Sequence, residues 1–199
     1  SNASSLLYST TFPCNNNNIL ALLGLGEIYY EEKYGQQDYN KAKHYYELAA
    51  QKHYNSFALC KLGNIYSKGK LGKINYEKSI KYYKKAAKLG YENGYYSLAT
   101  IYYQINDNQV NIDKIIKYLE KTLEINANHI DSLNLLGYIY LNERISSENH
   151  EKAKRYFSKS LSNDPTNQDK YALCNYGDYY YYAQYEAKDL PKATQYYMQ

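Results

Sequence analysis

The stretch from Ser56 to Gly90 reads SFALCKLGNIYSKGKLGKINYEKSIKYYKKAAKLG and contains two helical patterns joined by a loop. In the first pattern, apolar and small residues recur at helical spacing from Ala58 to Tyr66. In the second, Asn75 precedes an amphipathic run from Ile80 to Ala87. A hairpin of two such helices cannot bury its apolar stripe alone, so copies of it have to stack on one another. The sequence therefore predicts an all-α protein built from stacked hairpins.

The same pattern recurs along most of the 199 residues with a fixed internal spacing. Each copy has a small residue in the middle of its first helix and, 15 positions later, a lysine that opens its second helix. The small residues are Gly26, Gly63, Ala99, Gly137 and Gly177. The lysines are Lys41, Lys78, Lys114, Lys152 and Lys192. We therefore expect five repeats, at 19–55, 56–93, 94–129, 130–167 and 168–199.

Four further positions of the repeat predict how each hairpin is built. Residues of N-cap type stand three before each lysine, where each would stabilise its helix by about 1 kcal/mol: Asp38, Asn75, Asn111, Asn149 and Asp189. Tyrosines stand three after each small residue and four after each lysine, where we expect their rings to pack between the helices: Tyr29, Tyr66, Tyr102, Tyr140 and Tyr180, then Tyr45, Tyr82, Tyr118, Tyr156 and Tyr196. Small residues five before the central position are expected to let neighbouring helices approach closely: Ala21, Ala58, Gly94, Ser132 and Ala172.

Composition limits the classes of function. A formal charge of +4 is too small to indicate binding to nucleic acid or to an anionic membrane. No apolar run approaches the roughly 20 residues of a membrane-spanning helix. The 30 tyrosines are unusual, and they are explained either by a recognition surface or by an AT-rich genome, which also favours Asn, Ile and Lys.

Residues 1–18 lack periodicity and are expected to form an irregular leader or the remnant of a preceding repeat. Their first three residues resemble what is left of a cleaved expression tag. The three cysteines do not pair within repeats, which favours a cytoplasmic protein over a disulfide-stapled secreted one. Because the native start of the chain is not visible, the compartment stays open.

Catalysis finds little support in the sequence. The four histidines are scattered, and no two stand at metal-ligand spacing: His44, His53, His129 and His150. There is no phosphate-binding glycine loop and no nucleophile elbow. We therefore expect no metal, no cofactor and no enzymatic activity.

The motifs Leu62-Gly63-Asn64-Ile65-Tyr66 and Asn75-Tyr76-Glu77-Lys78-Ser79 resemble the SEL-1-like repeat, a relative of the tetratricopeptide repeat. The resemblance covers residues 19–199, although the ends of the third and fourth repeats look more like tetratricopeptide connectors. It implies a right-handed α-solenoid of about five helix-turn-helix repeats. It also implies an adaptor that binds a peptide or protein on a concave face lined by the first helices.

The positions that line this face in the resembled family give the candidate partner-binding residues of this chain. They are Glu27, Tyr30, Glu31, Asn64, Lys68, Tyr96, Tyr103, Gln104, Asn134, Tyr138, Asn142, Asp178 and Tyr181. They combine tyrosines with amides and acids, a composition typical of recognition surfaces. Lys68 is the only basic residue among them, so a clamp for a terminal carboxylate is missing and the acids instead indicate a ligand with some positive charge.

Three hypotheses of function follow. The first is a non-enzymatic scaffold that binds a protein or peptide partner. The second is a module that self-associates weakly through an uncapped C-terminal end near Tyr196 and Tyr197, where the sequence stops without a polar capping helix. The third is the regulatory or targeting part of a larger enzyme.

Overall fold

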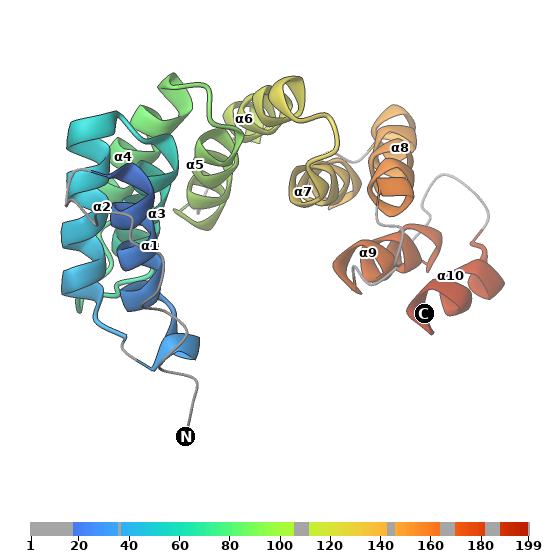
Figure 1. The fold of residues 1–199 in the computed structure, drawn as a ribbon. Coiled ribbons are helices and arrows are strands. Elements are labelled where there is room, and N and C mark those ends of the chain that lie inside the picture. Colours follow the sequence, from blue (N-terminus) through green and yellow to red (C-terminus); the bar gives the residue numbers. More distant parts are fainter. Residues whose placement is uncertain are drawn as a thin grey trace. The chain divides into compact units, whose positions relative to one another are not determined.

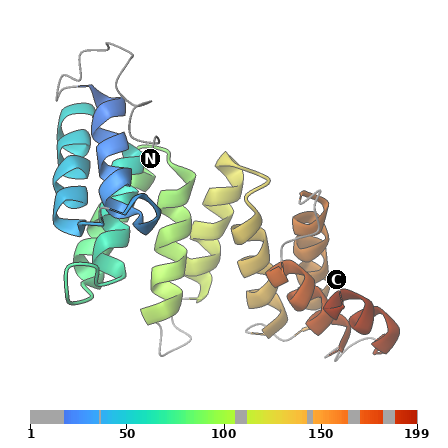
Figure 2. The same cartoon turned by 60° about the horizontal axis from the view of Figure 1, so that its bottom comes forward.

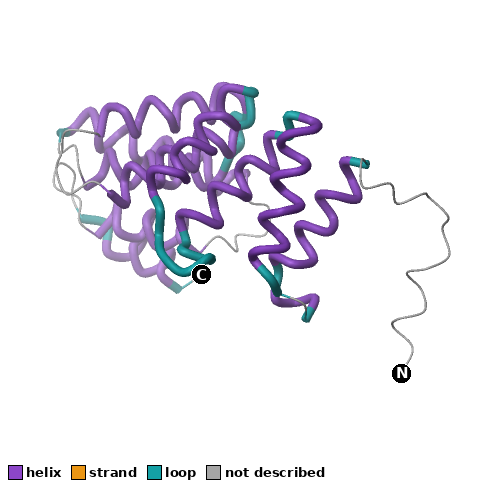
Figure 3. Tube along the Cα trace, turned by 90° about the vertical axis from the view of Figure 1, so that its left-hand side faces the viewer, coloured by secondary structure: helices purple, strands orange, loops and turns teal. Residues whose placement is uncertain are grey.

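The structure, a computed structural model, describes residues 18–35, 37–105, 112–142, 146–163, 170–181 and 188–198. In these residues the regular structure consists of ten α-helices and one short 3-10 helix, without a strand (Figure 1). Figure 3 shows the same chain as a succession of helical rods joined by loops. The predicted all-α class is therefore confirmed.

The helices alternate as the repeat pattern predicted. The first helices of the hairpins are α1 (Ile19–Tyr30), α3 (Ser56–Ser67), α5 (Glu92–Ile105), α7 (Ile130–Asn142) and α9 (Lys170–Tyr181). The second helices are α2 (Tyr39–His53), α4 (Tyr76–Lys88), α6 (Ile112–Ile125), α8 (Ser147–Asn163) and α10 (Leu190–Tyr197). The 3-10 helix η1 (Glu32–Tyr34) follows α1.

The chain forms two compact units, which divide between Lys85 and Ala86 within α4. In unit one, residues 1–85, α2 packs against both α1 and α3. Its core holds fully buried side chains from all three helices, among them Leu22, Tyr46 and Leu62.

Unit two, residues 86–199, continues the alternation from α5 to α10 (Figure 2). Each helix packs on the next along the chain, and α7 also contacts α9, which brings consecutive first helices together. The core is filled by apolar side chains such as Ile115, Leu119, Leu136 and Phe157.

The predicted second-helix caps are confirmed where Asp38, Asn75 and Asp189 accept hydrogen bonds from backbone N–H groups of the first helical turn. The prediction for Asn149 is wrong. Helix α8 begins one turn earlier, and the hydroxyl of Ser146 accepts the bond from the Asn149 N–H at 3.2 Å. Serine is an equally good cap, and it precedes the helix that actually forms. Asn111 lies outside the described residues.

The first helices have a cap register of their own, eight positions before the small residue. Asn18 accepts from the N–H of Leu20, and Asn55 accepts from the N–H of Ala58 at 2.8 Å. The leader prediction placed Asn18 outside the repeats, but its side chain caps α1; the rest of that leader lies outside the described residues. His129 occupies the same register before α7 and uses its ring nitrogen instead of an amide oxygen.

The central glycines are required because an aromatic ring of the second helix lies on each of them, 20 positions later. A Cβ atom on Gly26 would lie 2.5 Å from the Tyr46 ring, and one on Gly177 would lie 2.6 Å from the Tyr197 ring. A Cβ atom on Gly63 would overlap the Tyr83 ring, and one on Gly137 would overlap the Phe157 ring. In the third repeat the small residue is Ala99, and the residue 20 positions later is Leu119 instead of an aromatic.

The small residues five before the centre also allow close approach where their side chains are described. Ala58 and Ser132 are fully buried, whereas Ala21 is only half-buried. A Cβ atom on Gly94 would lie 2.5 Å from the backbone nitrogen of Ala87 at the end of α4. That backbone contact leaves no room for a side chain.

The ten repeat tyrosines form five stacked pairs, one in each hairpin. In every pair a first-helix ring lies nearly parallel to a second-helix ring, as in Tyr29 with Tyr45, at centroid distances of 5.7 to 5.8 Å. The repeat lysine lies over the first-helix ring of its own hairpin, as in Lys114 over Tyr102 at 3.9 Å. The predicted packing between helices is confirmed, but the rings are half-buried, so each hairpin carries a cation–π contact near the surface.

We expect Gly137→Ala to destabilise the protein by about 1 to 3 kcal/mol, because its methyl group would overlap the Phe157 ring. The double variant Gly137→Ala/Phe157→Leu reproduces the Ala99 and Leu119 pair of the third repeat, so it should recover part of that loss relative to the sum of the single variants. Urea unfolding of the four proteins measures this coupling. Additive effects of the two changes would contradict the explanation.

Candidate functional site

Each unit has a first-helix face of its own, which we define as the surface carried by α1 and α3 in unit one and the surface carried by α5, α7 and α9 in unit two. The predicted partner-binding residues come from these helices and the turns that end them.

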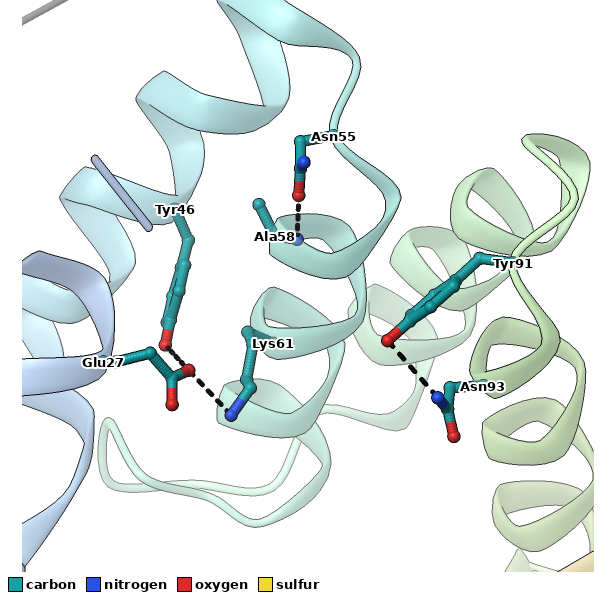
Figure 4. Close-up of polar contacts among 7 residues, drawn as sticks. All are labelled: Glu27, Tyr46, Asn55, Ala58, Lys61, Tyr91 and Asn93. Atoms are coloured by element: carbon teal, nitrogen blue, oxygen red, sulfur yellow. Dashed lines mark hydrogen bonds and ion pairs between the residues drawn. The ribbon is translucent and has the colours of Figure 1, made fainter. Parts of the chain in front are cut away.

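In unit one, Glu27 is the centre of a network between two repeats (Figure 4). The hydroxyl of Tyr46 donates to Glu27 Oε1 at 2.6 Å, and the ammonium of Lys61 pairs with the same oxygen at 2.8 Å. Burial by itself raises the pKa of Glu27, but the hydrogen bonds from Lys61 and Tyr46 outweigh it and hold the pKa below its usual 4.5. The carboxylate is therefore ionised and fixed at neutral pH.

Two aromatic rings complete this network around the Lys61 ammonium. It lies 4.9 Å from the centroid of the Tyr30 ring and 5.0 Å from that of Phe57. Burial, with the nearby Tyr39, raises the pKa of Tyr30 to about 12, so its hydroxyl stays neutral. The slot between α1 and α3 is thus a cation site that the chain fills with its own lysine.

The other unit-one candidates are placed differently. Asn64 accepts a hydrogen bond from the Tyr83 hydroxyl at 2.6 Å, as Glu27 does from Tyr46. Glu31 and Lys68 lie at the C-terminal ends of α1 and α3, where Glu31 is half-buried and Lys68 is exposed. Asn64 therefore has a structural contact in addition to its predicted role in binding.

Unit two contains a pocket of about 500 Å³ on this face. Five of the predicted residues line it together: Tyr96, Tyr103, Gln104, Asn134 and Tyr138. Four residues outside the predicted set complete the lining: Thr100, Asp131, Leu135 and Asn175. The lining comes from α5, α7 and α9, so three consecutive first helices build one cavity.

The missed residues follow a register that the sequence contains. Asp131 and Leu135 stand six and two positions before the central glycine, and Asn175 stands two before Gly177. Asp131 and Leu135 are four residues apart, so their side chains lie on the same side of the helix. This side is next to the one that carries the predicted residues Asn134 and Tyr138, which stand three before and one after Gly137. Unit one uses the same two positions for Phe57 and Lys61, which were also missed.

The wall of the pocket is fixed by His129 at the start of α7. The backbone N–H of Ser132 donates to His129 Nδ1 at 3.2 Å, so Nε2 carries the proton and donates to Asn93 Oδ1 at 3.2 Å. The His129 ring lies 5.0 Å from the Tyr96 ring. Burial lowers the pKa of His129, although the carboxylates of Asp131 and Glu92 partly oppose that effect. Burial, with Asp131, also raises the pKa of Tyr96 to about 12.

The three remaining candidates lie outside the pocket lining. Asn142 is exposed, and its amide donates to the backbone oxygen of Tyr138. Asp178 accepts from the Tyr197 hydroxyl at 2.6 Å, and Lys188 lies over the ring of Tyr181 at 5.7 Å. These three residues therefore do not contribute to the lining of the cavity, although Asn142 contacts the backbone of Tyr138 beside it.

The tyrosines named in the self-association hypothesis make contacts within their own hairpin. Tyr196 stacks on Tyr180 at 5.8 Å, and the Tyr197 ring lies on Gly177. Met198, the last described residue, is 81% exposed. Self-association through this end stays a prediction.

Within the described part of the chain, no group of three or more His, Cys, Asp or Glu side chains is placed to hold a metal ion. In the same residues, the search for a helix with the length and apolar character needed to span a membrane finds none.

Comparison with known proteins places these features in a family. The pattern of the Sel1 repeat matches residues 19–54, 56–91, 130–165 and 170–197, more than half of the chain. The third hairpin, α5 with α6, falls between the matched segments. A search of curated protein sequences finds no match.

Solved structures share the fold. A protective antigen of uropathogenic Escherichia coli with an SLR fold is 27% identical, with a TM-score of 0.76 over 90% of this chain and 37% of its own. A Sel1 repeat protein from Oxalobacter formigenes is 20% identical, with a TM-score of 0.71 over 90% of this chain and 71% of its own. YrrB, a TPR protein described as having an unusual peptide-binding site, is 19% identical, with a TM-score of 0.60 over 92% of this chain and 88% of its own. The fold is thus a helical-repeat solenoid, and this chain spans little more than a third of the Escherichia coli antigen.

The depressed pKa of Glu27 predicts an acid-sensitive contribution to stability. This contribution is complete above the unfolded-state value near 4.5 and is lost as the pH falls through the lower folded-state pKa. Lys61→Met removes the ammonium, so it should reduce this loss when urea unfolding is measured between pH 6 and pH 3. The matched variant Lys84→Met, on the exposed side of α4, should behave as the parent protein does.

The lowered pKa of His129 predicts a second pH effect with a different window. Because the folded state favours the neutral ring, stability should fall as the pH drops from about 6.5 through the lower folded-state pKa. His129→Asn introduces the cap that Asn55 provides in the second repeat, which does not titrate. The variant should fold at pH 7 and lose the dependence between pH 7 and pH 5 in thermal unfolding; an unchanged dependence would refute this assignment.

Proposed function

The chain belongs to the Sel1 repeat family. From this we propose that it is a non-enzymatic adaptor. Its first-helix face binds an extended peptide segment of a partner protein. Repeats of this family and of the related TPR class generally mediate protein–protein interaction. The observation that carries the proposal for this chain is the cavity of about 500 Å³ built by three consecutive first helices.

The lining of the cavity supports a peptide as the ligand. Tyrosine rings offer rigid apolar area and a polar edge, and they lose little conformational entropy on binding. The amides of Gln104, Asn134 and Asn175 are groups that pair with a peptide backbone. Tyr138 is 37% exposed, so a ligand has access to part of its ring. The peptide-binding site for which YrrB is described adds a precedent in the same fold.

Unit one supports a lesser role in binding. Glu27 and Asn64 each accept a hydrogen bond from a tyrosine of the second helix, and Lys61 occupies the slot between α1 and α3. Groups that are already paired have to break a contact before they bind a ligand, so they contribute less net affinity. The cavity lies in unit two, and we place the strongest contacts there.

The test is selection of random 12-residue peptides displayed on phage against the whole chain, followed by fluorescence polarisation with the best peptide. Tyr138→Ala removes a pocket wall, so it should weaken binding about tenfold or more without lowering the melting temperature. Tyr34→Ala removes a tyrosine that is exposed outside the pocket and serves as the matched control.

Two outcomes would overturn the proposal. One is that no peptide is enriched after selection on the folded chain. The other is that Tyr138→Ala and Tyr34→Ala bind the selected peptide equally well, because the peptide would then lie elsewhere.

A further inference from the structure

The two units treat equivalent slots between first helices differently. In unit one the slot between α1 and α3 holds the ammonium of Lys61, against the Tyr30 ring and the Glu27 carboxylate. Lys61 stands two positions before its central glycine, and Tyr30 stands four after the central glycine of the preceding repeat. Residues at these positions of the repeat thus hold a cation, the ammonium of Lys61, within the chain itself.

The same register in unit two has different residues. Tyr103 occupies the position of Tyr30, and Leu135 occupies the position of Lys61. The carboxylate comes from the other helix of the pair. Thr100 on α5 occupies the position of Glu27, and Asp131 on α7 occupies the position of Phe57. A ring and a carboxylate are therefore kept, but the side chain that supplies the cation in unit one is replaced by an apolar one.

The geometry of the unit-two slot suits a cation. The rings of Tyr103 and Tyr138 are 6.4 Å apart and nearly perpendicular, at 87°, so they form two adjoining walls. Tyr96 also lines the pocket, and Asp131 is exposed at its edge. Among the nine lining residues Asp131 is the only charged one, so the charge of this pocket is negative although the whole chain is at +4.

We propose, resting on the proposed function, that this pocket selects peptide segments carrying an arginine or lysine side chain, whose cation packs on the Tyr103 and Tyr138 rings and pairs with Asp131. Tyrosine faces attract such cations, and the chain itself makes a lysine–tyrosine contact of this kind in each of its five hairpins. The pocket is larger than one side chain requires, which leaves room for the flanking backbone beside Asn134 and Asn175.

The test uses the peptides selected on the whole chain. The proposal expects arginine or lysine to be enriched at one position. The best peptide is then synthesised with arginine at that position and with citrulline, which has nearly the same shape but no charge. The arginine peptide should bind about fivefold to tenfold more tightly than the citrulline peptide, and the difference should shrink as salt is raised.

Two variants locate the cation. Asp131→Asn should weaken the arginine peptide about fivefold and leave the citrulline peptide almost unchanged. Asp113→Asn makes the same change in the first turn of α6, outside the pocket, and should have no effect on either peptide. Thermal unfolding checks that both variants are folded.

A third variant uses the comparison of the two units. Leu135→Lys places an ammonium where Lys61 stands in unit one, so it should weaken the arginine peptide more than the citrulline peptide. Leu135→Met keeps the position neutral and apolar, and it should preserve the preference for arginine. If the lysine variant is unstable, the Asp131 pair of variants still decides the question.

The outcomes separate this inference from the proposed function. Peptides that bind in the pocket with equal affinity for arginine and citrulline would overturn the inference and leave the adaptor function standing. Selection of no peptide would overturn both. Binding of free choline as tight as that of the arginine peptide would overturn the choice of a peptide, since the site would then recognise a small ammonium compound.

Discussion

The structure depends on a contact, made in four of the five hairpins, between an aromatic ring of the second helix and a glycine of the preceding first helix. A ring in this position would overlap a Cβ atom on the first helix, so only glycine leaves room for it. Glycine in mid-helix costs roughly 0.5 to 1 kcal/mol relative to alanine, and burial of an aromatic ring more than offsets that cost. In three of the four hairpins with this contact the ring is a tyrosine, and its hydroxyl then reaches an acceptor next to the glycine: Glu27, Asn64 or Asp178. In the fourth repeat the ring is that of Phe157, which has no hydroxyl to donate. The residue after the glycine is then Tyr138, which lines the pocket.

This constraint explains why different repeats present different surfaces with one architecture. In the first two repeats the residue after the glycine is engaged by the second helix, and Lys61 joins consecutive repeats through Glu27. In the third and fourth repeats the second-helix residues are Leu119 and Phe157, which carry no hydroxyl. The residues after the small position, Thr100 and Tyr138, then face the pocket instead of the hairpin interior. The loss of an internal hydrogen bond and the gain of a cavity are therefore parts of the same change.

Much of the fold follows from the sequence because the hairpin has a strict length. The spacing from small residue to lysine predicted ten helices in alternation, and the caps at Asp38, Asn75 and Asp189 follow from local hydrogen bonding alone. Asn149 was misassigned because Ser146, also of cap type, stands three residues earlier, and the repeat register favoured the wrong one. For the site, positions taken from the resembled family found five pocket residues, but they missed Asp131 and Leu135, which belong to a neighbouring strip of the same helix. Spacing also gave no sign that Glu27, Asn64 and Asp178 have partners, because that depends on a residue 19 positions further on.

The matched set of glycine, acceptor and aromatic ring also restricts how these hairpins can recombine. The first, second and fifth repeats carry interchangeable sets, so a hybrid of one first helix with another second helix keeps both the contact and the hydrogen bond. A hybrid that joins the Glu27 helix to the Phe157 helix would remove the hydroxyl donor that Tyr46 supplies to Glu27. One that joins the Ala99 helix to the Tyr46 helix would place a methyl group in the path of the ring. Gene duplication and exchange in such an array would therefore preserve whole hairpins, and crossovers inside a hairpin would survive only between repeats of the same set.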